Sequence, residues 1–174
     1  MFLFVCPGLG YGTVGVTQNS ILFGQSAILS DIGLNMRKGI LAAFNEVNQE
    51  GGIYGRQLKL ISLDDSYEPE KTVENTRQLI NKVFALIGGV GTPTSRAVLP
   101  MISETSIPYI GPFTGAEFLR DKKQKNVINI RASYMILSQN TEELLLLNPK
   151  KVNLHNLQFL YPSKRMNNKI IMAK

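Results

Sequence analysis

Apolar positions along the chain recur with two different periods, and their alternation predicts a series of strands and helices. Residues 20–25 (SILFGQ) form a short apolar run that ends in glycine and glutamine, which favours a first strand. Residues 34–49 repeat apolar positions at spacings of four, four and three, typical of one helix face: Met36, Ile40, Phe44 and Val47. Gly51 and Gly52 follow, and glycine accepts the left-handed backbone that commonly ends a helix.

The same alternation continues as far as residue 130. Apolar runs bounded by glycine, aspartate or proline predict four more strands, at 57–63, 84–87, 107–110 and 127–130. The segments between them predict helices at 69–82, 95–104 and 117–120, and a further helix is expected at 141–147. Pro69 suits the first turn of its helix, where its missing N–H would have no partner. In that helix we expect Val73, Thr76 and Ile80 to face inward.

This order of elements favours an α/β fold with a doubly wound, mostly parallel sheet and helices on both of its faces. Three regions are expected: a signal-peptide remnant or disordered start at 1–19, a ligand-binding lobe at 20–134, and a divergent, poorly ordered basic tail at 135–174. In such sheets ligands bind beyond the carboxyl ends of the strands. Two glycine-rich loops, 88–95 and 111–115, follow the third and fourth strands and should both lie at that edge.

The first of these loops offers hydroxyl groups and the start of a helix. Thr92, Thr94 and Ser95 surround Pro93, and a helix start carries unpaired N–H donors and a partial positive charge that favour an anion. The carboxylate of a free amino acid would satisfy such a site. The alternative is that Thr94 or Ser95 only caps the helix. A phosphate-binding P-loop is excluded because its Gly-Lys-Ser/Thr ending is missing.

The second loop combines an aromatic ring, a hydroxyl and a flexible backbone in Phe113, Thr114 and Gly115. These groups suit a ligand with a polar head and an apolar part. An ordinary turn between a strand and a helix would have the same composition. The two loops therefore give the candidate ligand-binding residues without choosing between the two interpretations.

Candidate catalytic, metal-binding and redox chemistry is sparse. His155 is the only histidine and Cys6 the only cysteine, so neither a disulfide, a zinc cluster nor a nucleophile–histidine set can be assembled. The adjacent Asp64 and Asp65 are expected to be caps or solvated, not an acid–base pair. We expect a protein that is not an enzyme and that uses no metal or cofactor.

The charge pattern argues against a nucleic-acid-binding protein. The net charge is +6, but most of the excess lies beyond residue 140, where six basic residues face only two acidic ones. A working nucleic-acid footprint is a basic patch on a folded face. No apolar run reaches the roughly 18–20 residues that a membrane span needs, so no membrane-spanning segment is expected.

Several short motifs occur in one order that is similar to a known family. Residues 36–80 (MRKGILAAFNEVNQEGGIYGRQLKLISLDDSYEPEKTVENTRQLI) contain the Asn-x-x-Gly-Gly-Ile-x-Gly turn and the Asp-Asp…Pro helix start. They are followed by FALIGGVGTPTSRAVLP, IPYIGPFTGAEFLR and RASY. Residues 21–134 thereby resemble the N-terminal lobe of the leucine/isoleucine/valine-binding proteins, a family of periplasmic binding proteins of ABC transporters.

The resemblance implies a type I periplasmic binding protein lobe that captures an amino acid-like small molecule in the periplasm. It implies an ABC transporter permease as a partner. It places Thr92, with Thr94 and Ser95 beside it, at the ligand carboxylate, and Phe113, Thr114 and Gly115 at the carboxylate and ammonium.

Three departures from the family shape the expectation. The loop after the first strand (SAILSDIG) looks shorter than the family's loop, which normally helps to wall the ligand. The chain has about half the family's length, and its pattern diverges from Met135 onward. We therefore expect a single truncated lobe. A sensory ligand-binding domain of a signalling receptor and a non-functional fragment are the alternatives.

Overall fold

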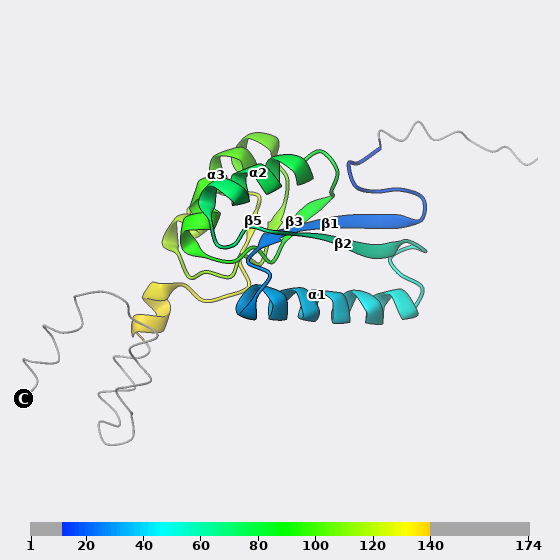
Figure 1. The fold of residues 1–174 in the computed structure, drawn as a ribbon, viewed down its shortest axis with the longest axis horizontal. Helices are drawn as coiled ribbons and strands as arrows, with labels where there is room; N and C mark the ends of the chain where they lie inside the picture. The colour runs from blue at the N-terminus through cyan, green and yellow to red at the C-terminus, as the bar shows by residue number, and fades with distance from the viewer. Residues whose placement is uncertain (1–11, 140–174) are drawn as a thin grey trace, which may run out of the picture. The chain divides into compact units, whose positions relative to one another are not determined.

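The computed structural model describes residues 12–139, and the chain divides after Tyr134. Five parallel strands form one sheet in the order β2-β1-β3-β4-β5 (Figure 1). The strands are β1 Ser20–Ala27, β2 Gln57–Asp64, β3 Ala85–Ile87, β4 Tyr109–Ile110 and β5 Val127–Ile128. The helices are α1 Asp31–Gln49, α2 Pro69–Leu79, α3 Thr92–Thr105 and the 3-10 turn η1 Glu117–Arg120. The predicted doubly wound α/β fold is confirmed.

The helices lie on both faces of the sheet. Figure 1 shows α1 along one face and α2 and α3 together on the other. The strand order reverses between β1 and β3, because β2 lies on one side of β1 and the later strands extend on the other. In open parallel sheets the crevice at such a reversal, beyond the carboxyl ends of the strands, is the usual place for a ligand.

Register brings the carboxyl ends of the strands to one edge. β1 and β2 pair along their whole length, from Ser20 opposite Gln57 to Ala27 opposite Asp64. On the other side of β1, Leu86 of β3 pairs with Tyr109 of β4. The loops that leave β2, β3 and β4 therefore emerge at this same edge, with the end of β1 between the first two.

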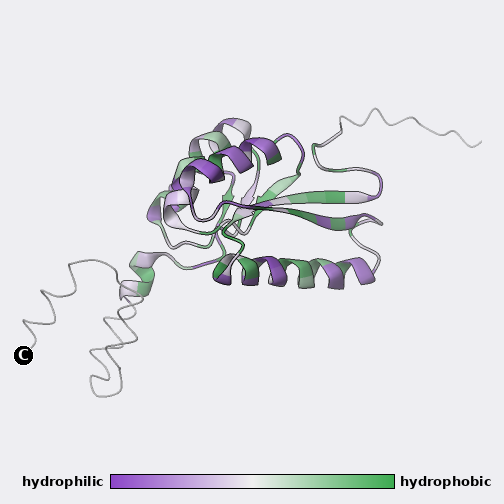
Figure 2. Ribbon diagram, viewed as in Figure 1, coloured by the Kyte–Doolittle hydropathy of each residue, from purple (hydrophilic) through white to green (hydrophobic). Residues whose placement is uncertain are grey.

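The apolar core lies between the sheet and the α2–α3 layer. Its buried members come from α2, α3, β3, β4, η1 and the segments just before β3 and β4, and they are Leu79, Val83, Leu86, Val98, Ile102, Ile107, Tyr109 and Leu119. On the other face, Ile40 and Phe44 are buried and Met36 and Val47 half-buried, as their spacing predicted. Figure 2 shows α1 as alternating hydrophobic and hydrophilic bands, as expected of an amphipathic helix.

Several element ends differ from the predicted ones. The helix expected to start at Ser95 begins at Thr92, because Gly91 turns the chain with φ +109° and Pro93 fits the first turn. The preceding helix ends at Leu79, not at residue 82, and its most buried positions are Thr72, Thr76 and Leu79.

The strand ends also shift. β3 begins after Phe84, whose side chain is 37% exposed and packs edge-on against Phe23. β4 and β5 are two-residue strands, shorter than the predicted 107–110 and 127–130. The helix expected at 141–147 and the start at 1–11 lie outside the described residues.

Residues ahead of β1 are tied to the sheet. The hydroxyl of Thr17 accepts hydrogen bonds from the backbone N–H of Asn19 and Ser20 at 3.2 and 2.9 Å. The backbone carbonyl of Thr17 accepts a 2.8 Å bond from the Arg56 side chain. This turn fixes the amino ends of β1 and β2, opposite the edge where the loops gather.

Candidate functional site

The two glycine-rich loops meet at the carboxyl edge of the sheet. Val90 and Phe113 form a parallel bridge beyond β3 and β4, and the Phe113 N–H donates to the carbonyl of Gly89 at 2.7 Å. This bridge holds the loops in register. It places Thr92 and Thr114 so that their hydroxyl oxygens lie 2.7 Å apart, within hydrogen-bond distance. Two predicted site residues from different loops are thus brought together.

Tyr134 adds a third hydroxyl to this pair. Its phenol oxygen lies 3.4 Å from the Thr114 hydroxyl, and its backbone N–H donates to the carbonyl of Gly115 at 2.8 Å. A Cβ at Gly115 would lie 2.6 Å from the Tyr134 ring, so the absence of a side chain there lets the ring approach. The role of Gly115 is therefore to admit Tyr134.

Neighbouring groups lower the pKa of the Tyr134 phenol. Partial burial raises its pKa, but hydrogen bonds with Thr114 and Thr92 and the nearby Arg131 outweigh that effect. The pKa of Tyr134 consequently lies below its ordinary value.

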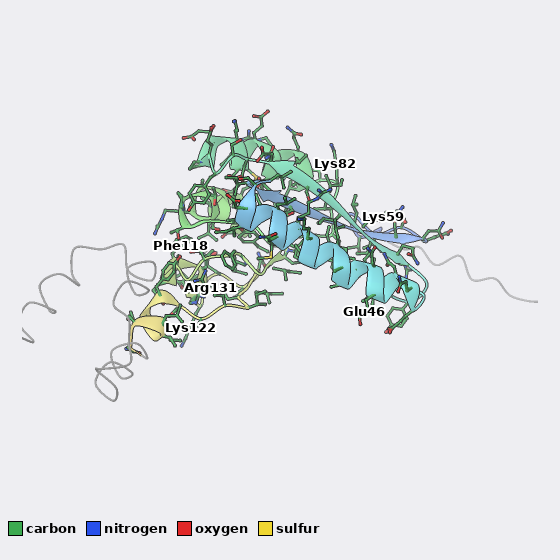
Figure 3. The ribbon with its side chains drawn as sticks, turned by 60° about the horizontal axis from the view of Figure 1, so that its bottom comes forward. Glu46, Lys59, Lys82, Phe118, Lys122 and Arg131 are labelled. Atoms are coloured by element: carbon green, nitrogen blue, oxygen red, sulfur yellow. The ribbon has the colours of Figure 1, made fainter. Side chains whose placement is uncertain are left out.

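A guanidinium group borders the three hydroxyls. The Cζ atom of Arg131 lies 4.8 Å from the centre of the Phe113 ring and 5.7 Å from that of Tyr134, which is cation–π distance. Figure 3 shows Arg131 at the end of the sheet away from Glu46. Phe113 is 38% exposed, so the ring supports the guanidinium and still offers apolar surface. The edge therefore presents a cation and an apolar surface together.

The hydroxyls of Thr94 and Ser95 bond to groups inside the protein and not to the Thr92–Thr114 pair. Both residues are buried. Thr94 donates to the carbonyls of Val90 and Gly91 at 2.5 and 3.1 Å, and the Ser95 hydroxyl lies 3.2 Å from that of Tyr109. Neither residue is the N-cap, because Gly91 occupies that position. They fix the loop from inside, whereas Thr92 faces the edge.

The start of α3 supplies further donors. The first N–H groups of a helix have no partner within the helix, and Pro93 has no N–H. The backbone amides of Thr92 and Thr94 remain as the donors of this turn. They lie beside the Thr92 hydroxyl at the positive end of the helix.

Three side chains at this edge were not predicted as site residues: Tyr134, Arg131 and Tyr67, whose ring lies against the Gly91 backbone. Tyr134 and Arg131 belong to the RASY motif, which follows β5 and so also arrives at the carboxyl edge. Tyr67 follows the Asp-Asp pair at the end of β2. All three residues lie in segments that follow a parallel strand, and this position in the sequence could have identified them.

Within residues 12–139 no group of three or more His, Cys, Asp or Glu side chains could hold a metal ion. Nor does any helix of that range have the length and hydropathy to cross a membrane.

Comparison with known proteins shows the family and the fold. A family model described as periplasmic binding protein matches residues 21–145. A possible leucine/isoleucine/valine-binding protein from Rhodopirellula baltica is similar in structure, with 37% identity and a TM-score of 0.69. A fatty acid ABC transporter substrate-binding protein from Thermomonospora curvata is 27% identical, also with a TM-score of 0.69.

A third structure shares the fold. The branched-chain amino acid transporter substrate-binding protein LivJ from Streptococcus pneumoniae, solved with isoleucine, is 22% identical with a TM-score of 0.58. The matches cover 80%, 78% and 67% of this chain but only 38%, 35% and 35% of the three structures. The chain thus spans less than two-fifths of their length.

Proposed function

The chain belongs to the periplasmic binding protein family, and from this premise we propose that it captures an amino acid or a similar small polar ligand for ABC-type import. Members of this family are solute-binding proteins, not enzymes. The observation that carries the proposal is the convergence of Thr92, Thr114 and Tyr134 at the carboxyl edge of the sheet.

The groups at this edge favour a ligand carboxylate. Three hydroxyls, the amides at the start of α3 and the guanidinium of Arg131 are all donors or positive, and a carboxylate accepts several hydrogen bonds at once. The lobe is suited to the anionic end of the ligand.

The apolar part of the ligand would lie on the exposed aromatic surface. Phe113 and Tyr134 are 38% and 45% exposed and flank the hydroxyl pair. An aliphatic side chain or an acyl chain could pack there and remove apolar area from water. A branched-chain amino acid and a fatty acid both have a carboxylate joined to an apolar group.

A permease partner and a periplasmic location follow from the same proposal. A solute-binding protein of an ABC importer hands its ligand to a membrane permease, and the location comes by similarity to relatives. Closure of a second lobe over the site would bury the ligand further and strengthen binding.

Isothermal titration calorimetry of the purified chain tests the proposal. The panel contains leucine, isoleucine, valine, a mixture of the other amino acids and a medium-chain fatty acid. We expect saturable binding of at least one carboxylate ligand, weakened by Thr92→Ala. Absence of heat with every ligand, from a chain shown to be folded by circular dichroism, would contradict it.

A further inference from the structure

The loop after β2 holds two consecutive residues in an unfavourable backbone conformation. Ser66 has φ +51° and Tyr67 φ +65°, in the left-handed region where a Cβ is crowded. Strained backbone of this kind persists only where surrounding contacts determine it, and it gathers at functional sites. The contacts around this loop therefore indicate why the left-handed conformation is kept.

The two aspartates of the loop hold it in place. Asp64 accepts the N–H of Ser66 and Asp65 accepts the N–H of Tyr67, each at 2.9 Å. Asp65 is fully buried, and its second oxygen accepts the hydroxyls of Ser26 and Thr72 at 3.0 Å. The backbone of Tyr67 is thus anchored to β1 and to α2 through a buried carboxylate.

The anchored backbone directs the Tyr67 ring across the end of β1. A Cβ built on Gly91 would lie 2.4 Å from Cε2 of Tyr67 and 2.9 Å from its Cζ, so the ring rests against the Gly91 backbone. Tyr67 follows β2 and Gly91 follows β3, and β1 lies between these strands. The ring therefore spans the crevice at the reversal of strand order and ends beside Thr92.

The loop after β1 is short. It consists of Ile28, Leu29 and Ser30, and Gly33 lies directly against the carbonyl of Ile28. The Ile28 and Leu29 residues are half-buried. Tyr67 remains 44% exposed although its ring rests on Gly91.

We propose that Tyr67 is a specificity-determining residue, the aromatic wall of the ligand site on the β1 side of Thr92, in contact with the apolar part of the ligand. The inference rests on the proposed function and adds a residue and a role to it. A wall here would place the apolar group between Tyr67 and Phe113, with the carboxylate at Thr92.

Substitution of Tyr67 by glycine distinguishes a role in ligand contact from a role in stabilising the fold. Tyr67→Gly removes the ring and also relieves the left-handed strain, so the fold should be as stable as before or more stable. Tyr54 provides the matched control, because it has φ +50°, is 93% exposed and lies in the turn before β2, at the opposite end of the sheet. Tyr67→Phe keeps the ring without its hydroxyl.

The experiment is calorimetric titration of the full chain with isoleucine and with alanine, and thermal unfolding of each variant. We expect Tyr67→Gly to weaken isoleucine binding about tenfold or more, and alanine binding much less, since alanine has little apolar group to lose. Tyr54→Gly and Tyr67→Phe should bind isoleucine like the unmodified chain.

The outcomes distinguish this inference from the proposed function. Unchanged isoleucine binding by Tyr67→Gly, or equal weakening for isoleucine and alanine, would overturn the role of Tyr67 and leave the proposed function standing. If Tyr67→Gly loses stability, Tyr67→Asn replaces it, since asparagine tolerates the left-handed region. No binding by the unmodified chain to any ligand of the panel would overturn both proposals.

Discussion

The hydroxyl oxygens of Thr92 and Thr114 lie 2.7 Å apart, although 22 residues separate them in the sequence. Two neighbouring parallel strands, β3 and β4, bring them together, because each threonine lies in the loop that leaves its strand. One hydroxyl of the pair donates to the other, and the one that accepts keeps its own hydrogen for a ligand oxygen. The pair is therefore the first target for substitution.

Thr92→Val should weaken ligand binding while leaving the fold intact. Valine keeps the shape of threonine but removes the hydroxyl, and the loss of one ligand hydrogen bond costs about 1–3 kcal/mol, or about fivefold to 150-fold in Kd. Titration calorimetry with the best ligand of the panel measures the change. Thr105→Val is the control, because the exposed Thr105 hydroxyl bonds only to the carbonyl of Met101 at the far end of α3. Equal affinities for the two variants would remove Thr92 from the site.

Gly115→Ala should destabilise the lobe and displace Tyr134. The added methyl would lie 2.6 Å from the Tyr134 ring and 2.8 Å from its backbone nitrogen, and backbone cannot move aside as a flexible side chain can. Overpacking of this kind costs about 1–3 kcal/mol in the free energy of unfolding. Urea unfolding measures it.

Gly39→Ala gives the opposite result and serves as the matched control for Gly115. An added methyl at Gly39 on α1 meets nothing within 4 Å. Alanine in place of glycine within a helix stabilises by about 0.5–1 kcal/mol. A stabilising Gly115→Ala would show that Tyr134 does not pack against this turn.

Asp65→Asn should lower the free energy of unfolding by about 1–3 kcal/mol, since a buried donor that loses its acceptor costs this much. The buried carboxylate accepts from Ser26, Thr72 and the N–H of Tyr67, and an amide has only one acceptor oxygen to offer them. Urea unfolding measures this change too, with Asp121→Asn as the control. Asp121 is exposed and uses one oxygen to accept from the backbone N–H of Lys123, which asparagine can still do. Similar costs for both variants would argue against a buried anchor.

Tyr109 should make stability depend on alkaline pH. Burial raises its pKa from 10.0 to about 12, with the hydrogen bond to Ser95 opposing the shift. Below pH 10 both folded and unfolded chains keep the phenol proton, so its contribution to stability is complete. As pH rises from about 10 to about 12, the unfolded chain loses the proton while the folded chain keeps it, and stability falls.

Tyr109→Phe isolates this contribution. The difference in the free energy of unfolding between the unmodified chain and the variant should shrink by about 1.4 kcal/mol between about pH 9 and about pH 11. Titrations of the other tyrosines and lysines largely cancel in that difference. A difference independent of pH would show that Tyr109 titrates alike in both states.

The hydrophobic pattern predicted the fold because each layer has its own period. Ile40 and Phe44 repeat with the helical period and are buried against the sheet, as expected. Leu86 and Ile87 form a continuous apolar run in a central strand covered on both faces. Phe84 was wrongly included in that strand, since an apolar run does not show where pairing begins.

The arrangement of the two glycine-rich loops was predicted in part. Loop position after parallel strands placed Thr92 and Thr114 at the same edge. It could not tell which hydroxyls of the first loop face outward, because that depends on where α3 starts, and Gly91 starts it earlier than predicted. As a result the hydroxyls of Thr94 and Ser95 turn inward.

The remaining residues were missed because they come from other parts of the sequence. Tyr134 reaches the site only through its contact with Gly115, and Tyr67 only through the left-handed turn fixed by Asp65. Neither contact produces a periodic pattern in the sequence. Contacts between residues far apart in the sequence are determined by tertiary packing.

Nuclear magnetic resonance tests the central claim most directly. Amide spectra of the isotope-labelled chain are recorded during titration with isoleucine or with the best ligand of the calorimetric panel. We predict that the largest shift changes occur at Gly91, Thr92, Thr114, Gly115 and Tyr134, with little change in the turn at Tyr54, at the other end of the sheet. Saturating ligand that leaves the five amides unmoved, or that moves only the Tyr54 turn, would contradict the assignment of the carboxyl edge as the ligand site.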